Sequence, residues 1–270
     1  MEDSERVPLA HSTVGPPDAP VVVFLHGFLG GKSDWIATTN VLRETYRCIS
    51  IDLPGHGESP GDPESCSMES VATALIDLVD TLDAPSFSMV GYSMGGRIAL
   101  YVASIYAMRV DALVLESASP GLRSETERAE RRATDERWAR MLEDDGMKTF
   151  LDAWYEQPLF ASLVSRADLI EQIKTKRLAN NPRALARALR GFSVGRQAPL
   201  WDEWTANLIP TLIVAGELDV KYSVLAHEMV LLSRKSSYTM FQNVGHNVHE
   251  EAPDAYNRVI HAFLDETIKV

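Results

Sequence analysis

The chain has 270 residues, of which 45% are hydrophobic and 24% are charged, and its formal net charge is −12. This size and composition are those of one large α/β domain, or of a core with an inserted lid. The acidic balance argues against a nucleic-acid partner and against binding to an anionic membrane surface. An anionic substrate would therefore need a local basic pocket that works against the overall field.

Compartment signals come from the N-terminus and the cysteines. Residues 1–6 are polar and have neither the apolar core of a signal peptide nor the composition of a transit segment. No apolar run is long enough to span a bilayer. Cys48 and Cys66 show no disulfide or metal-ligand pattern and are predicted to be free thiols. We expect a soluble protein in a reducing compartment, the cytoplasm in a bacterium or the plastid stroma in a plant. A larger multifunctional parent polypeptide is equally compatible with the sequence.

Apolar, strand-like runs alternate with amphipathic, helix-like runs along most of the chain. The apolar runs predict strands at residues 21–26, 47–52, 87–90, 112–115, 212–215 and 238–244. Helical spacing predicts helices at residues 67–82, 97–106 and 252–264, the first with Ser67 as its N-cap. This alternation predicts an α/β fold with a mostly parallel central sheet flanked by helices.

The segment 120–207 breaks this alternation. Its pattern is helical, it is rich in Arg and Trp, and it holds no convincing strand. We interpret it as a helical lid inserted between two strands, so that residues 1–119 and 208–270 form the core.

A nucleophile elbow is predicted around Ser93. Gly91, Ser93 and Gly95 form a Gly-x-Ser-x-Gly pattern between the apolar run 87–90 and the helix-like run 97–106. Side chains at the two glycine positions would clash with the neighbouring strand and helix. The three fixed positions alone would occur by chance in roughly one chain in ten, so the strand-then-helix context carries the prediction.

A serine hydroxyl becomes a nucleophile or a base when a histidine takes its proton and an acid orients the imidazole. The elbow predicts the chain order serine, acid, histidine. Asp219 follows the run 212–215, and His246 lies just past the last predicted strand, so both fit this order. Glu116 is a rival acid. His249 is a rival base, although we expect it to face solvent or to support the lid.

An oxyanion hole is predicted from two backbone N–H groups. Phe28 follows the first apolar run and Met94 opens the helix after Ser93, so their N–H groups are the expected donors. His26 and His56 are expected to be structural. No metal and no cofactor is suggested, because the seven histidines lack ligand spacing and the glycines near Lys32 lack the spacing of a phosphate loop.

Several arginines separate this chain from a generic hydrolase. Arg97 lies four residues after Ser93 and should face the same side of its helix. Six arginines lie in the stretch 123–140, and most are expected to pair with neighbouring acids. Arg131 shares a helical face with Trp138, which should point inward. Guanidinium groups over one serine would suit a substrate with more than one carboxylate, since Arg binds carboxylates bidentately.

The chain resembles the synthases that make 2-succinyl-6-hydroxy-2,4-cyclohexadiene-1-carboxylate in the menaquinone and phylloquinone pathways, which belong to the α/β-hydrolase superfamily. The resemblance covers nearly the whole chain. It rests on motifs that include 24–30, 91–97, 128–138, 150–163 and 245–249. The elbow motif 91–97 and the histidine motif 245–249 are shared by the whole superfamily, whereas the Arg-rich stretch 128–138 and the aromatic stretch 150–163 are narrower.

The resemblance implies an elimination. Pyruvate would leave 2-succinyl-5-enolpyruvyl-6-hydroxy-3-cyclohexene-1-carboxylate, a small polycarboxylate. Ser93, activated by His246 and Asp219, would help to remove a ring proton while charge develops on the succinyl carbonyl in the oxyanion hole. By motif, the substrate-binding residues would be Tyr92, Arg97, Arg131, Trp154 and Arg177.

Three questions stay open in the sequence. The adjacent Arg131 and Arg132 leave the register of the pocket arginine open by one position. The predicted triad alone would also support a serine hydrolase that acts on ester, thioester or carbon–carbon bonds, or a non-catalytic binding module on the same fold. Nor does the sequence say whether Ser93 acts as a base or forms a covalent adduct.

Overall fold

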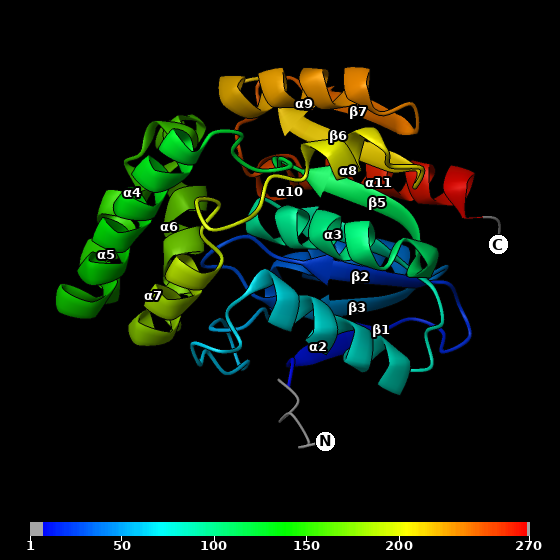
Figure 1. Cartoon of the computed structure of the whole chain (residues 1–270), viewed down its shortest axis with the longest axis horizontal. Helices are drawn as coiled ribbons and strands as arrows, with labels where there is room; N and C mark the ends of the chain where they lie inside the picture. The colour runs from blue at the N-terminus through cyan, green and yellow to red at the C-terminus, as the bar shows by residue number, and fades with distance from the viewer. Residues whose placement is uncertain (1–7, 269–270) are drawn as a thin grey trace.

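The computed structural model describes residues 8–268, and its centre is one seven-stranded sheet in the order β1-β3-β2-β4-β5-β6-β7 (Figure 1). The strands are β1 (His11–Val14), β2 (Val21–Leu25), β3 (Arg47–Ile51), β4 (Phe87–Tyr92), β5 (Val110–Glu116), β6 (Thr211–Gly216) and β7 (Ser236–Phe241). Among the strand pairings of these residues, only that of β1 with β3 is antiparallel. The predicted α/β class with a mostly parallel sheet is confirmed.

Helices cover both faces of the sheet. Those of the core are α1 (Ile36–Leu42), α2 (Met68–Thr81), α3 (Met94–Ile105), α8 (Trp201–Thr205), α9 (Val220–Leu232), α10 (Val248–Glu251) and α11 (Pro253–Thr267), with short 3-10 helices η1 (Lys32–Trp35) and η2 (Ala107–Arg109). β2 shows how the core is divided: Val23 packs with the cluster of α2 and α3, whereas Phe24 packs with that of α1 and α11. This alternation follows from the period of two along a strand.

All six strands predicted from the apolar runs are present, with boundaries that differ by a few residues. The predicted helix cap is also confirmed, since the Ser67 side chain accepts the N–H of Ser70 at 3.0 Å. β1 was not predicted. Its four residues are all exposed and largely polar, so it has no apolar pattern and is held by main-chain pairing with β3 at the edge of the sheet.

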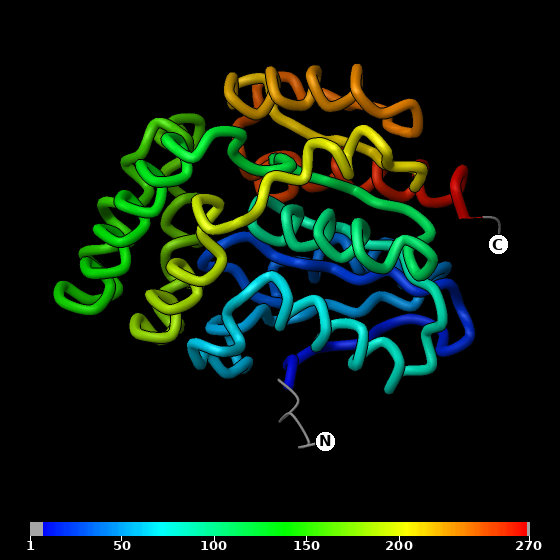
Figure 2. Tube along the Cα trace, viewed as in Figure 1, coloured from blue at the N-terminus to red at the C-terminus, as the bar shows by residue number. Residues whose placement is uncertain are grey.

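Between β5 and β6 the chain forms helices and no strand. They are α4 (Glu125–Asp144), α5 (Gly146–Tyr155), η3 (Pro158–Ser165), α6 (Ala167–Arg177) and α7 (Pro182–Gly191), followed by α8. Figure 2 shows the chain leaving the sheet, making α4 to α7 at one end of the molecule, and returning. These helices enclose their own apolar cluster, which includes Leu29 of the core. Trp201 and Trp204 of α8 pack instead with the main core. The limits of the lid at 120 and 207 stay a prediction.

Two further features of the described residues bear on the sequence predictions. Cys48 and Cys66 are free, as expected, and both are buried. Among residues 8–268, no helix combines the length and the apolar character that crossing a bilayer requires.

Candidate active site

Ser93 occupies a sharp turn between β4 and α3. Its backbone lies at φ 50° and ψ −106°, an unfavourable region for a residue with a side chain, which costs on the order of 1–3 kcal/mol. The turn is possible because Gly91 and Gly95 have no side chain. A Cβ on Gly91 would come within 2.6 Å of the Gly95 oxygen, and a Cβ on Gly95 would overlap the backbone of Leu25. Both positions therefore require glycine if α3 is to begin directly against β2.

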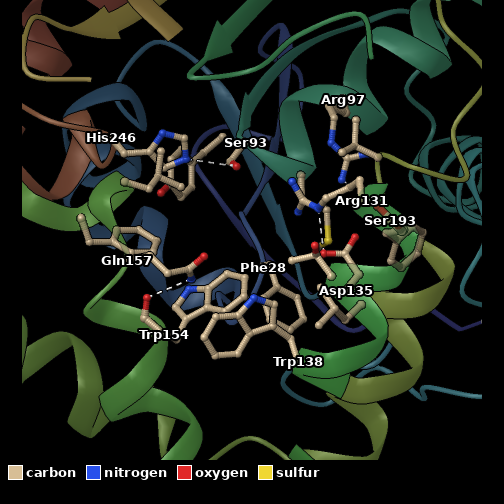
Figure 3. A pocket seen from close by; sticks show the side chains of 18 of the residues that line it. Phe28, Ser93, Arg97, Arg131, Asp135, Trp138, Trp154, Gln157, Ser193 and His246 are labelled. Carbon is tan, nitrogen blue, oxygen red and sulfur yellow. Dashed lines mark hydrogen bonds and ion pairs between the residues drawn. The ribbon is translucent and has the colours of Figure 1, made fainter. Parts of the chain in front are cut away.

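The structure brings Ser93, His246 and Asp219 together from three separate loops. His246 Nε2 lies 3.2 Å from Ser93 Oγ (Figure 3). His246 Nδ1 lies 2.6 Å from Asp219 Oδ2. Asp219 follows β6 and His246 follows β7, and both side chains are buried. If Nδ1–H donates to the carboxylate, Nε2 is free to accept the proton of Ser93.

The rival acid and base form a separate pair. His249 Nδ1 lies 2.8 Å from Glu116 Oε1, and the backbone N–H of His249 donates to the same oxygen. His249 is buried and stacks on Trp35 with ring centroids 4.8 Å apart. The expectation that His249 faces solvent or supports the lid is therefore wrong, because α10 turns it back into the core. Burial would lower the pKa of His249, but the charge and hydrogen bond of Glu116 outweigh burial and raise it.

Phe28 and Met94, the predicted oxyanion donors, both line the pocket that contains Ser93. Met94 is the first residue of α3, where helical N–H groups have no intrahelical partner. Among the hydrogen bonds of residues 8–268, neither of these two N–H groups donates to a protein acceptor. Their placement is compatible with the predicted oxyanion hole.

Two histidines of the neighbouring loops are structural, as expected. His26 Nε2 accepts the N–H of Leu53 at 2.9 Å, and its Nδ1 lies 2.7 Å from the Gly27 oxygen. The ring of His56 is buried and meets the ring of Phe28 edge-on. These contacts shape the loops on which the candidate site is built.

Arg97 reaches the pocket as a buried cation. Its guanidinium donates to Gln197 Oε1 and to the Phe192 carbonyl oxygen, each at 2.7 Å, and both acceptors are neutral. Within the described part of the chain no carboxylate forms an ion pair with it. Burial lowers the pKa of Arg97 to about 10, so it is still charged at neutral pH. An unpaired buried cation of this kind is suited to a ligand carboxylate.

Arg131 also lines the pocket, and Figure 3 shows Arg97 and Arg131 on one side of Ser93 with His246 on the other. Arg131 Nε donates to Asp135 Oδ1 at 2.7 Å. Arg132 instead donates to the Gly195 oxygen and to a surface glutamate, outside this pocket. Of the two adjacent arginines, Arg131 is therefore the one that faces Ser93.

Arg177 forms a buried ion pair. Its guanidinium donates to Asp34 Oδ1 at 2.7 Å, both side chains are buried, and Arg177 is not among the residues that line the pocket. Burial would raise the pKa of Asp34, but the charge and hydrogen bond of Arg177 lower it. The last turn of α6 therefore faces the loop after β2, and direct contact of Arg177 with the substrate stays a prediction.

Aromatic rings form much of the remaining wall. Tyr92 and Trp154 line the pocket, as does Trp138, which points inward as predicted. The Tyr92 hydroxyl donates to Asn247 Oδ1 at 2.5 Å. Gln157 and Ser193 also line the pocket, and sequence reasoning missed both. Neither carried a signal, since a lone polar residue in a helical segment is placed only by the packing of the lid.

The described residues contain no cluster of three or more His, Cys, Asp or Glu side chains that could hold a metal ion.

The sheet with its flanking helices and the elbow serine facing a histidine define an α/β-hydrolase-fold protein, and the alpha/beta hydrolase fold family matches residues 20–253. A Bacillus subtilis protein is 36% identical over 264 residues, which are 97% of this chain and 96% of that one. The 2-succinyl-6-hydroxy-2,4-cyclohexadiene-1-carboxylate synthase of Salmonella agona is 34% identical, over 88% of this chain and 91% of its own length. MenH from S. aureus has a similar structure, with a TM-score of 0.90 at 34% identity, over 95% and 98% of the two chains. The chain belongs to this synthase family.

Another similar protein is much longer. The chloroplastic protein PHYLLO of Arabidopsis thaliana is 36% identical over 252 residues, which are 87% of this chain but 15% of PHYLLO. A unit of this kind therefore occurs both as a chain of similar length and within a larger polypeptide.

Proposed function

We propose that the chain eliminates pyruvate from 2-succinyl-5-enolpyruvyl-6-hydroxy-3-cyclohexene-1-carboxylate to give 2-succinyl-6-hydroxy-2,4-cyclohexadiene-1-carboxylate. The observation that carries this proposal is the pairing of two guanidinium groups, Arg97 and Arg131, with a histidine-bonded serine in one pocket. The names of the similar proteins supply the particular product. The partner is a small polycarboxylate.

Charge placement supports the binding step. Arg97 is a buried cation held by neutral acceptors, so a substrate carboxylate gains attraction there that water does not screen. Arg131 uses its Nε on Asp135, which leaves its terminal nitrogens for a second carboxylate. The rings of Trp138 and Trp154 cover the apolar ring of the substrate and exclude water.

The chemical step needs a base and a place for negative charge. His246, oriented by Asp219, takes the proton of Ser93, and the Ser93 oxygen removes the ring proton next to the succinyl carbonyl. The negative charge that develops on that carbonyl oxygen is stabilised by the N–H groups of Phe28 and Met94. The electron pair left at C2 then forms a double bond to C3, the existing C3–C4 double bond moves to C4–C5, and the C5–O bond to the enolpyruvyl group breaks. The leaving enolpyruvate takes up one proton and becomes pyruvate, so no water is consumed.

The setting of this reaction is part of the proposal. Burial raises the pKa of the Cys48 thiol to about 12 and that of Cys66 to about 11, so neither is a reactive thiolate at neutral pH. Because both cysteines are free thiols, we infer that the unit works under reducing conditions, alone or as one domain of a larger pathway enzyme, with no need of a cofactor.

The test is to incubate the protein with the enolpyruvyl substrate while following pyruvate and the diene absorbance together. We expect the two products to appear in equal amounts. Ser93→Ala should lower kcat by about 10³-fold or more while still binding substrate, because the pocket arginines are untouched. Wild-type turnover by Ser93→Ala would contradict the proposed role of Ser93.

A further inference from the structure

The lid helix α6 ends beside the loop that carries Phe28. At its last residue, Arg177 pairs with Asp34 Oδ1 at 2.7 Å, and the other oxygen of Asp34 accepts the N–H of Gly31 at 3.1 Å. Just beyond the helix, Asn180 Nδ2 donates to the Leu29 carbonyl oxygen at 2.9 Å. Besides the apolar packing of Leu29, the lid therefore holds the loop 27–31 through two polar contacts, one of them by way of Asp34.

This loop has a backbone that needs support. Leu29 lies at φ 70°, in the left-handed region that non-glycine residues rarely occupy. A Cβ on Gly30 would come within 2.7 Å of Asp34 Oδ2 and 2.8 Å of His26, so the turn is also tightly packed. Such conformations persist only where the surroundings fix them. The direction of the neighbouring Phe28 N–H depends on this turn.

The other end of the same helix lies beside the loop that carries His246. Arg166, which precedes α6, donates to the Glu251 backbone oxygen at 2.8 Å, and Ser162 Oγ donates to Glu251 Oε1 at 3.1 Å. The Glu251 carboxylate in turn accepts the N–H groups of Gly245 and Asn247, at 3.0 and 3.3 Å. These two residues flank His246, so the lid contacts the group that fixes the histidine loop.

We propose that α6 is a brace that fixes the oxyanion loop relative to His246, and that Arg177 is a positioning residue that acts through Asp34 rather than a substrate ligand. The proposal rests on the proposed function for the identity of the reaction. A helix of 11 residues is a rigid rod of about 16 Å, long enough to contact both loops. The Arg177–Asp34 pair is 8% and 2% exposed, so solvent and salt weaken it little.

The test removes both charges of the pair together. Arg177→Met alone leaves Asp34 buried without a partner and could unfold the protein, whereas Arg177→Met/Asp34→Asn leaves no unpaired charge and keeps an acceptor for Gly31. We expect kcat of the double variant to fall by about 10-fold or more, with KM within about twofold of wild type, because a displaced donor weakens the transition state. Arg177→Lys, which keeps the charge, should recover part of kcat.

Arg190→Met is the matched control. Arg190 pairs with Glu136 and Glu143 inside the lid and touches neither loop, so kcat and KM should stay at the wild-type values. If Arg177 binds a substrate carboxylate instead, the double variant will show a KM raised many-fold with little change in kcat, and the proposal is overturned.

Hydrogen exchange provides a readout that is independent of substrate. In the double variant, amides of residues 27–34 should exchange at least about 10-fold faster than in wild type, while those of α3 should not change. Unchanged exchange at 27–34 together with unchanged kcat would overturn the brace. If wild-type protein does not release pyruvate, the proposed function fails, and the exchange rates still decide whether α6 holds the loop.

Discussion

At the scale of single residues, Arg97 is the side chain whose surroundings say most about function. A buried guanidinium that donates only to Gln197 and to a backbone carbonyl contributes less to stability than a paired one. Groups that destabilise a fold are typical of sites where binding or catalysis requires them. Because Arg97 lies four residues after Ser93 and lines the same pocket, we expect its charge to bind a carboxylate of the substrate.

We predict that Arg97→Met separates activity from stability. Loss of the carboxylate contact should lower kcat/KM by about 10²–10³-fold, or about 3–4 kcal/mol. The free energy of unfolding should stay within about 1–2 kcal/mol of wild type, since the desolvated charge and its two hydrogen bonds disappear together. Kinetics and urea unfolding measure the two effects. Arg132→Met, next to the pocket residue Arg131 but outside the pocket, should leave both unchanged; full activity in Arg97→Met would contradict the carboxylate site.

The site could be predicted where local sequence determines geometry. Ser93 is encoded by the glycines around it, and Asp219 and His246 by their chain order after strands. The partners of Arg177 and His249 could not be predicted, because a motif gives a position along a helix or loop but not the tertiary neighbour that a side chain meets. Asp34 and Glu116, which hold them, lie 143 and 133 residues away.

At the scale of elements, the join between β4 and α3 sets the position of Ser93. A Cβ on Gly95 would overlap the backbone of Leu25 and His26, which belongs to β2 and to the residue after it. Backbone cannot move aside as a flexible side chain can, so α3 would have to shift away from the sheet. Glycine is therefore required in the elbow for the packing of α3 against β2, independently of catalysis.

Gly95→Ala should accordingly destabilise the protein by about 3 kcal/mol or more, an overpacking effect at the upper end of the usual range. Gly146→Ala is the control. Gly146 lies at φ 78°, and a Cβ added there would meet no atom within 4 Å, so its cost is conformational only, about 1–2 kcal/mol. Thermal unfolding compares the two. A Gly95→Ala protein as stable as Gly146→Ala would refute the account of the elbow.

Elements were predictable from sequence in proportion to how much apolar surface they bury. β2 is buried at every residue and was found from its apolar run, whereas β1 is exposed at every residue and was missed. α9 was missed for a related reason. It is apolar on several sides, with Val220 and Val224 exposed, and so lacks the one-sided pattern that marks a surface helix.

At the scale of the whole molecule, the core contains a buried hydrogen-bonded pair, His249 and Glu116, that the proposed reaction does not use. His249 and Glu116 join the loop after β7 to the end of β5 beneath Tyr92, whose ring centroid is 4.8 Å from that of His249. The pair therefore connects the end of β5 to Tyr92, a residue that lines the pocket.

The raised pKa of His249 makes this part of the stability depend on pH. Its folded pKa lies above the ordinary value of 6.5, so the folded protein holds the proton more tightly than the unfolded chain. The contribution is complete below pH 6.5 and is lost as pH rises through the folded pKa. We predict that the stability advantage of wild type over Glu116→Gln is largest near pH 6 and shrinks toward pH 9. Urea unfolding across this range measures it, and an advantage that grows with pH would contradict the assignment.

The most direct test of the central claim compares two reactions in one preparation of the wild-type protein: release of pyruvate from the enolpyruvyl cyclohexene substrate, and hydrolysis of a simple aryl ester. We predict that kcat/KM for pyruvate release is larger by about 10³-fold or more, since only that substrate engages the arginines, and that no acyl group accumulates on Ser93. Faster ester hydrolysis, with acyl-Ser93 detected by mass spectrometry and no pyruvate formed, would contradict the account.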